Sequence, residues 1–288
     1  MSPLAPRGTA GSQRCSILDI PGPRWFSSDD PIWRVHGDVA TPIGITTGLL
    51  MLTANPAVAA SIEACGALEH PWSVDDYLHD LVEITTFGTV DDAVVTIEHA
   101  HRDRSAFSGT TEHGDYFYGT DPDLLKWGMA ATAWSLLAAY QRFGARPLDA
   151  GESDEYVRQF AGLSHLHGAR NSPTTVRELE QLLRGSRDRV RATTAGRHTA
   201  RRLRETAHAC PGVREDSVTA HRSCTTVVNA AASLVPSDVR RALHLAHRAV
   251  DRAAVFGRTA EAHQGLNSTE LTTPAPIAAP SAMRVATA

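Results

Sequence analysis

One histidine, His101, stands where an imidazole could bind a metal ion. It lies four residues after Ile97 and seven after Val94, on what would be one face of an α-helix. We therefore expect His101 to point to the buried side of its helix and His99 to point away. A neutral imidazole on an apolar helix face suits ligation of haem iron. The same place also suits a core histidine that hydrogen-bonds to a neighbour.

Two long helices joined by a glycine-containing turn must position His101. The first begins at Thr89, an N-cap with acidic residues after it, and we place its end at Gly109. The second begins at the N-cap Asp121 and ends at Gly144, for which we expect a left-handed cap. Its inner positions recur every three or four residues, which predicts a core helix: Leu125, Met129, Thr132, Leu136, Ala139 and Phe143.

Composition narrows the class of protein. A chain of 288 residues forms one large domain or two small ones. The formal net charge of −4 provides no global basic field, so we expect no nucleic-acid partner. The four cysteines form no CxxC pair and the N-terminus has no apolar run, which favours a cytoplasmic protein without a signal peptide.

An uncharged segment, 39–62, resembles a membrane span in length alone. It contains Pro42 and the pair Asn55–Pro56, a combination that a span tolerates poorly. We predict a buried core helix from about Ile45 to Cys65, kinked or restarted at Asn55–Pro56, and no stable membrane insertion.

Helical signals continue along the rest of the chain. Capping boxes are expected at Ser73 and at Thr175, and no stretch shows strand alternation between hairpin turns. The sequence therefore predicts an all-α fold of about eight to ten helices in a single globular domain. We assign residues 1–28 to a flexible leader, 29–262 to the domain and 263–288 to a disordered tail.

Several short motifs follow one another in a fixed order: WRVHGD at 33–38, NPAVAAS at 55–61, TFGT at 86–89, YGTDPDLLKW at 118–127, ESDEY at 152–156, SPTTVREL at 172–179 and LVPSDVRRAL at 234–243. With the helix of His101, they resemble the family that contains the latex-clearing rubber oxygenases and the fungal MpaB oxygenase of mycophenolic acid biosynthesis. The resemblance covers about Asp29 to Ala254.

The resemblance implies a function and a site. The family's characterised members are all-α haem b oxygenases, and its proximal histidine matches His101. It therefore implies a haem-dependent oxygenase acting on an apolar small molecule in a pocket between helices. In such a site Arg102 would reach the haem propionates, as Arg104 would. The opposite wall would come from three residues of the preceding helix: Tyr77, Leu78 and Leu81.

The chain also departs from the family's pattern. The helix before TFGT lacks an arginine and a threonine four residues apart, whose places fall near Val74 or Asp75 and near Leu78 or His79. The pair at 55–56 reads Asn-Pro instead of His-Pro. These departures leave open a haem-free relative that binds or rearranges a small molecule without redox chemistry.

A third interpretation uses iron without haem. A di-iron carboxylate bundle needs two Glu-x-x-His pairs and one glutamate from each of two other helices. The chain has such pairs at Glu98/His101 and Glu205/His208. The additional carboxylates would come from Glu63, Glu83 and Glu155. A chain with 14 histidines also produces such pairs by chance.

Overall fold

The computed structural model describes residues 17–68, 70–206 and 218–245, and for 218–224 it gives the helix but no side chains. This part of the chain is all-α, as predicted, with eleven α-helices where eight to ten were expected. They are α2 (Pro31–Gly37), α3 (Thr41–Thr53), α4 (Pro56–Ala64), α5 (Trp72–Phe87), α6 (Val90–Ser105), α7 (Pro122–Phe143), α8 (Ala150–Leu166), α9 (Val176–Gly185), α10 (Thr194–Glu205), α11 (Val218–Leu234) and α12 (Ser237–Ala242), with a 3-10 turn η1 (Arg187–Arg189) after α9.

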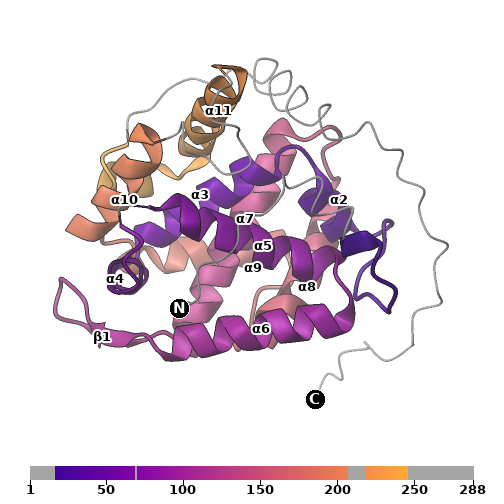
Figure 1. Ribbon diagram of the computed structural model, residues 1–288, viewed down its shortest axis with the longest axis horizontal. Helices are drawn as coiled ribbons and strands as arrows, with labels where there is room; N and C mark the ends of the chain where they lie inside the picture. Colours follow the sequence, from indigo (N-terminus) through magenta and orange to yellow (C-terminus); the bar gives the residue numbers. More distant parts are fainter. Residues whose placement is uncertain (1–16, 69, 207–217, 246–288) are drawn as a thin grey trace.

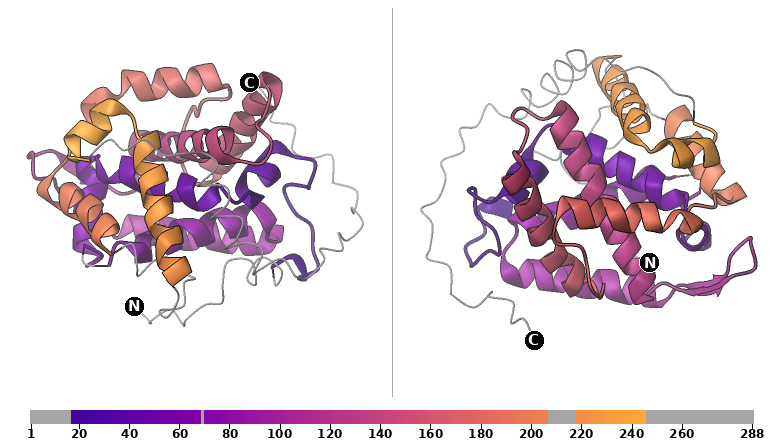
Figure 2. Two further views of the ribbon diagram at one scale, coloured as in Figure 1. Left: turned by 90° about the horizontal axis from the view of Figure 1, so that it is seen from above. Right: turned by 180° about the vertical axis from the view of Figure 1, so that it is seen from behind.

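Helices α3 and α7 form the centre of the molecule. They pack along one another, and α11 covers another side of α3 (Figure 1). Their approach is close: a Cβ atom at Gly44 would lie 2.8 Å from the Cα atom of Leu136. Figure 2 shows α10 and α11 on one side of this centre and α2 on the other. The position of α7 explains why almost its whole circumference is buried.

Local capping signals set the start of α7. The side chain of Asp121 accepts hydrogen bonds from the backbone N–H groups of Asp123 at 2.8 Å and Leu124 at 3.5 Å. The helix ends at Gly144, but the left-handed cap predicted there is wrong, because Gly144 has φ −67° and ψ 162°. Glycine is needed for space instead, since a Cβ atom would lie 2.6 Å from the carbonyl oxygen of Tyr140.

The uncharged segment forms two helices. Helices α3 and α4 meet at an angle of 101°, and Asn55 caps α4 by accepting from the N–H groups of Ala57 and Val58. The predicted restart at Asn55–Pro56 is confirmed, although α3 begins at Thr41, before Ile45. Within the described residues no single helix is long and apolar enough to cross a membrane. Only the bent α3–α4 pair there has the length and composition of a membrane span.

Helix α6 runs along one edge of the molecule beside α5 (Figure 1). Its N-cap at Thr89 is confirmed, since the Thr89 hydroxyl accepts from the N–H group of Asp92 at 3.2 Å. The helix ends at Ser105, before the predicted end at Gly109. Gly109 belongs to a short antiparallel hairpin of β1 (Ser108–Thr110) and β2 (Tyr116–Tyr118). Sequence alternation missed these strands because each has three residues.

The predicted capping box at the start of α5 is wrong. Ser73 does not cap α5, because its hydroxyl donates to the carbonyl of His70 at 2.7 Å.

The segment before α2 is held against the end of α5. Arg24 donates to the carbonyl of Phe87 at 2.9 Å, which ties residues 17–28 to the end of α5. The leader and tail boundaries stay predictions, since 1–16 and 263–288 lie outside the described residues.

Candidate functional sites

Helix α6 turns His101 toward solvent. Its buried face consists of Ala93, Ile97 and Ala100, whereas Val94 is 40% exposed and His101 is exposed. The predicted stripe of Val94, Ile97 and His101 shares only Ile97 with the buried stripe, which continues through the small Ala100. The prediction that His101 points to the buried side is therefore wrong, because α6 presents only a narrow stripe to its neighbours.

A shallow hollow of about 370 Å³ lies beside His101, between α6 and the end of α8. Its lining consists of Ile97, Glu98, His101, Arg102 and Leu166. His101 and Arg102 both line this hollow, and their roles in haem binding stay predictions. The three predicted wall residues of α5 do not line this hollow: Tyr77, Leu78 and Leu81. Tyr77 is 39% exposed, and Leu78 packs against the hydrophobic core.

The residues around His101 do not fit an enclosed haem. A haem bound through one imidazole needs an apolar wall over its other face, and bound ligands of this kind are mostly buried. The hollow supplies Ile97 and Leu166 beside the charged Glu98 and Arg102. Helix α5, which was expected to form the opposite wall, packs directly against α6. The ligand role of His101 stays a prediction.

The di-iron ligands do not come together in the described part of the chain. No group of three or more His, Cys, Asp or Glu side chains there lies close enough to hold a metal ion. Glu63 and Glu98 are exposed, and Glu155 pairs with Arg158. His208 lies outside the described residues.

Helix α5 carries an acid–imidazole–acid row made of Asp75, His79 and Glu83. Asp75 and Glu83 are buried, and the Nε2 atom of His79 lies 3.6 Å from the Oε1 atom of Glu83. The hydroxyl of Thr46 donates to Asp75 at 3.1 Å. Burial raises the pKa of Asp75 to about 7, and His79 and Thr46 oppose the rise. Spacing by four along one helix was the sequence signal for this row.

The half-buried Arg104 and the buried His167 join the ends of α6 and α8. The Nη2 atom of Arg104 lies 3.4 Å from both the Nδ1 atom and the carbonyl oxygen of His167. Burial, followed by the charge of Arg104, lowers the pKa of His167 to about 3. The imidazole is therefore neutral at physiological pH, and the guanidinium favourably faces the C-terminal end of α8.

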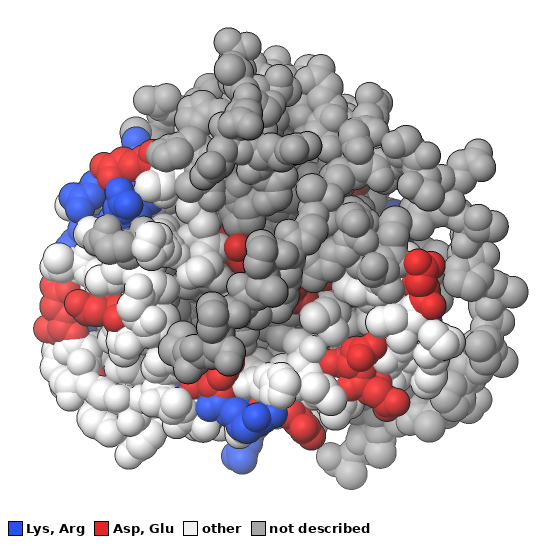
Figure 3. All heavy atoms as spheres, in the orientation of Figure 1, with Lys and Arg blue, Asp and Glu red and all other residues white. Residues whose placement is uncertain are grey.

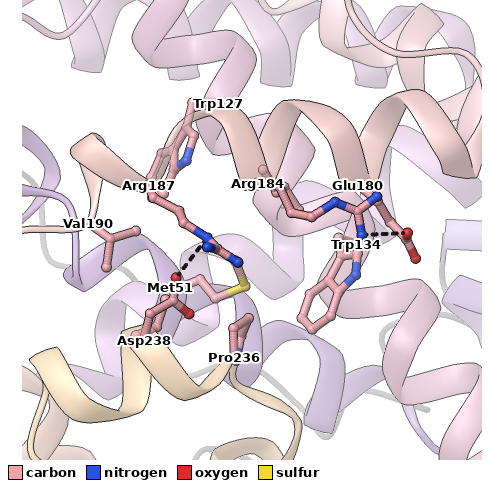
Figure 4. A pocket seen from close by; sticks show the side chains of 11 residues that line it. Met51, Trp127, Trp134, Glu180, Arg184, Arg187, Val190, Pro236 and Asp238 are labelled. Atoms are coloured by element: carbon pink, nitrogen blue, oxygen red, sulfur yellow. Dashed lines mark hydrogen bonds and ion pairs between the residues drawn. The ribbon is translucent and has the colours of Figure 1, made fainter.

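A deeper pocket of about 230 Å³ lies between α3, α7, α9 and α12 (Figure 4). Its floor is apolar, because Met51, Trp127 and Val239 are each at most 3% exposed. The remaining lining residues are Trp134, Glu180, Leu183, Arg184, Arg187, Val190, Pro236 and Asp238. Sequence analysis missed this pocket, since only tertiary packing brings its four helices together.

Charged side chains surround the mouth of this pocket. Arg184 donates to Glu180 at 3.1 Å within α9. The Nε atom of Arg187, on η1, lies 3.6 Å from a carboxylate oxygen of Asp238 on α12. Figure 4 shows this ion pair between Arg187 and Asp238, and the side chain of Arg187 is 69% exposed. The pocket therefore combines an apolar interior with polar groups at one end.

Charges elsewhere on the surface are scattered. On the described part of the face in Figure 3, acidic and basic side chains form small separate groups with uncharged surface between them. The expectation of no nucleic-acid partner stays a prediction.

A comparison with known families gives the class of the domain. The family model described as ER-bound oxygenase mpaB/B'/Rubber oxygenase, catalytic domain, matches residues 33–264. The chain belongs to this family. The matched region includes the deeper pocket and the helix of His101, and it confirms the resemblance found in the motifs. No curated protein and no solved structure matches the chain.

Proposed function

We propose that this oxygenase-family domain binds an apolar small molecule in the pocket between α3, α7, α9 and α12. The supporting observation is the lining of that pocket: Met51 and Trp127 are buried in its floor, while charged groups lie only at its mouth. Ligand pockets typically have apolar walls and a few polar groups that fix orientation. The volume of about 230 Å³ suits a molecule smaller than most drugs, whose pockets measure about 300–1,000 Å³.

The proposed site does not require haem. Its lining includes no histidine, and the hollow beside His101 lacks the second wall that an enclosed haem needs. This arrangement supports a haem-free member of the family that binds or rearranges its ligand without redox chemistry. We further propose that it works in the cytoplasm, in keeping with the free, exposed thiol of Cys65.

Calorimetric titration of the full chain with 1-naphthamide, a neutral two-ring probe, tests the proposal. The Val190→Trp substitution adds a large ring to a half-buried wall of the pocket. The control, Val95→Trp, adds the same ring to the exposed face of α6, where Val95 is 49% exposed. We expect the parent chain and the control to bind the probe and Val190→Trp to lose binding. Equal binding by both variants would rule out this pocket.

Haem-dependent oxygenation through His101 is the second candidate, favoured by the family match and by the hollow beside this residue. Haem would supply oxidation chemistry that the described side chains lack. The test is an absorption spectrum of protein produced with ample haem. A Soret band that His101→Ala removes and His99→Ala keeps would support this candidate, and a parent chain without the band would end it.

A further inference from the structure

We infer that the ligand of the α3–α7–α9–α12 pocket is an aromatic acid whose carboxylate binds Arg187. The inference rests on the proposed function, because it names the class of molecule that the same pocket would take. It draws on three features: the unused donors of Arg187, the aromatic wall and the exposed ion pair at the mouth.

The guanidinium of Arg187 has N–H groups that are available to a ligand. Its one ion pair, with Asp238, spans 3.6 Å, and its guanidinium makes no hydrogen bond to any residue that the structure describes. Arg184, in contrast, already donates to Glu180 at 3.1 Å. A guanidinium presents five N–H groups in a planar fork that matches a carboxylate with two parallel hydrogen bonds. Arg187 is therefore the residue at the mouth best able to bind an anionic group of a ligand.

The wall beside Arg187 suits an aromatic ring. Trp127 and Trp134 lie seven residues apart, two turns of α7, and both line the pocket with Met51 of α3 (Figure 4). Indole rings favour offset or edge-to-face contacts with other rings, and a thioether packs well against aromatic edges. A planar ring against these residues would leave its carboxylate directed to the mouth.

When the pocket is empty, the carboxylate of Asp238 pairs with Arg187 in place of the ligand's carboxylate. The side chains of Arg187 and Asp238 are 69% and 38% exposed, and exposed ion pairs contribute little stability. Exchange of one carboxylate for another at Arg187 therefore has a small energetic cost. The pair joins η1 to α12, on two sides of the mouth, so the exchange also opens the pocket.

Three matched probes test the inference at pH 7: 1-naphthoate, its neutral amide 1-naphthamide, and the cation 1-naphthylmethylammonium. By calorimetry on the full chain, we expect naphthoate to bind about tenfold more tightly than the amide, as a partly exposed charged hydrogen bond allows. Arg187→Gln should abolish this preference, because naphthoate then loses its charged partner. The control Arg184→Gln should keep the preference. Asp238→Asn should tighten naphthoate binding, because it removes the competing carboxylate.

The outcomes separate the two proposals. Equal binding of all three probes, or a naphthoate preference that survives Arg187→Gln, would overturn the inference while the pocket remains a binding site. Weaker naphthoate binding in Asp238→Asn would overturn the exchange at Arg187. If none of the probes binds the parent chain, the proposed function itself fails. Circular dichroism of each variant checks that the helical content is unchanged.

Discussion

Replacing Asp75 with asparagine should remove a pH-dependent loss of stability. Burial raises the pKa of this carboxyl from 3.8 to about 7, so the folded protein holds its proton more tightly than the unfolded chain. The stability that this proton contributes is present at low pH and is lost as the pH rises from about 4 to 7. Each pKa unit is worth about 1.4 kcal/mol, which gives a loss of at most about 4 kcal/mol.

The titration of His167 changes the stability of the fold in the opposite direction over much of the same pH range. Its pKa falls from 6.5 to about 3 in the folded protein, so the unfolded chain binds the proton more tightly. Stability from His167 is present above pH 6.5 and is lost as the pH falls toward 3. Between about pH 4 and 6.5 the two slopes oppose each other in the parent chain. A comparison of variants is therefore more informative than the parent profile alone.

Urea unfolding between pH 4 and pH 8 measures the effect. The asparagine side chain keeps an oxygen that can accept the hydrogen bond from the Thr46 hydroxyl. The variant therefore mainly removes the titrating carboxyl at position 75. We expect the free energy of unfolding of Asp75→Asn, minus that of the parent, to rise with pH by up to about 4 kcal/mol. The control Asp76→Asn, at an exposed position of the same helix, should give a much flatter difference. A difference for Asp75→Asn that does not change with pH would refute the reasoning.

Other predictions concern the packing and capping of individual helices. Gly44→Ala should destabilise the protein by about 1–3 kcal/mol in urea unfolding, because the new methyl group would meet the backbone at Leu136. Gly162→Ala, whose Cβ atom meets nothing within 4 Å, should instead stabilise α8 by up to about 1 kcal/mol, and equal effects of the two substitutions would contradict the close α3–α7 approach. Asn55→Ala should lower stability by about 1 kcal/mol through loss of the α4 cap, and an unchanged melting temperature would count against it.

Signals that are local in sequence predicted the helices well. The N-caps at Thr89 and Asp121 and the break at Asn55–Pro56 lie where the sequence placed them, because each depends on hydrogen bonds within a few residues. The face of α6 was predicted wrongly, since Ala100 and His101 are neighbours that continue the same stripe almost equally well. Packing against other helices decides between them.

The candidate site depended more on tertiary structure than the fold did. Trp127 lay in a recognised motif, but nothing in the sequence connected it with Met51, Arg187 or Asp238, which lie on three other elements. The row of Asp75, His79 and Glu83 had a visible spacing of four. Its burial was not visible, because Asp76 and Asp80 share the helix and are less buried than Asp75.

The most direct test of the proposed pocket is the set of indole N–H signals in a ¹H–¹⁵N NMR spectrum. The chain has five tryptophans, and Trp→Phe variants would assign each signal. On addition of 1-naphthoate we predict large shifts for Trp127 and Trp134, which line the pocket. The signals of Trp25, Trp33 and Trp72 should move little. Saturable shifts confined to these three, or no shifts at all, would contradict the account.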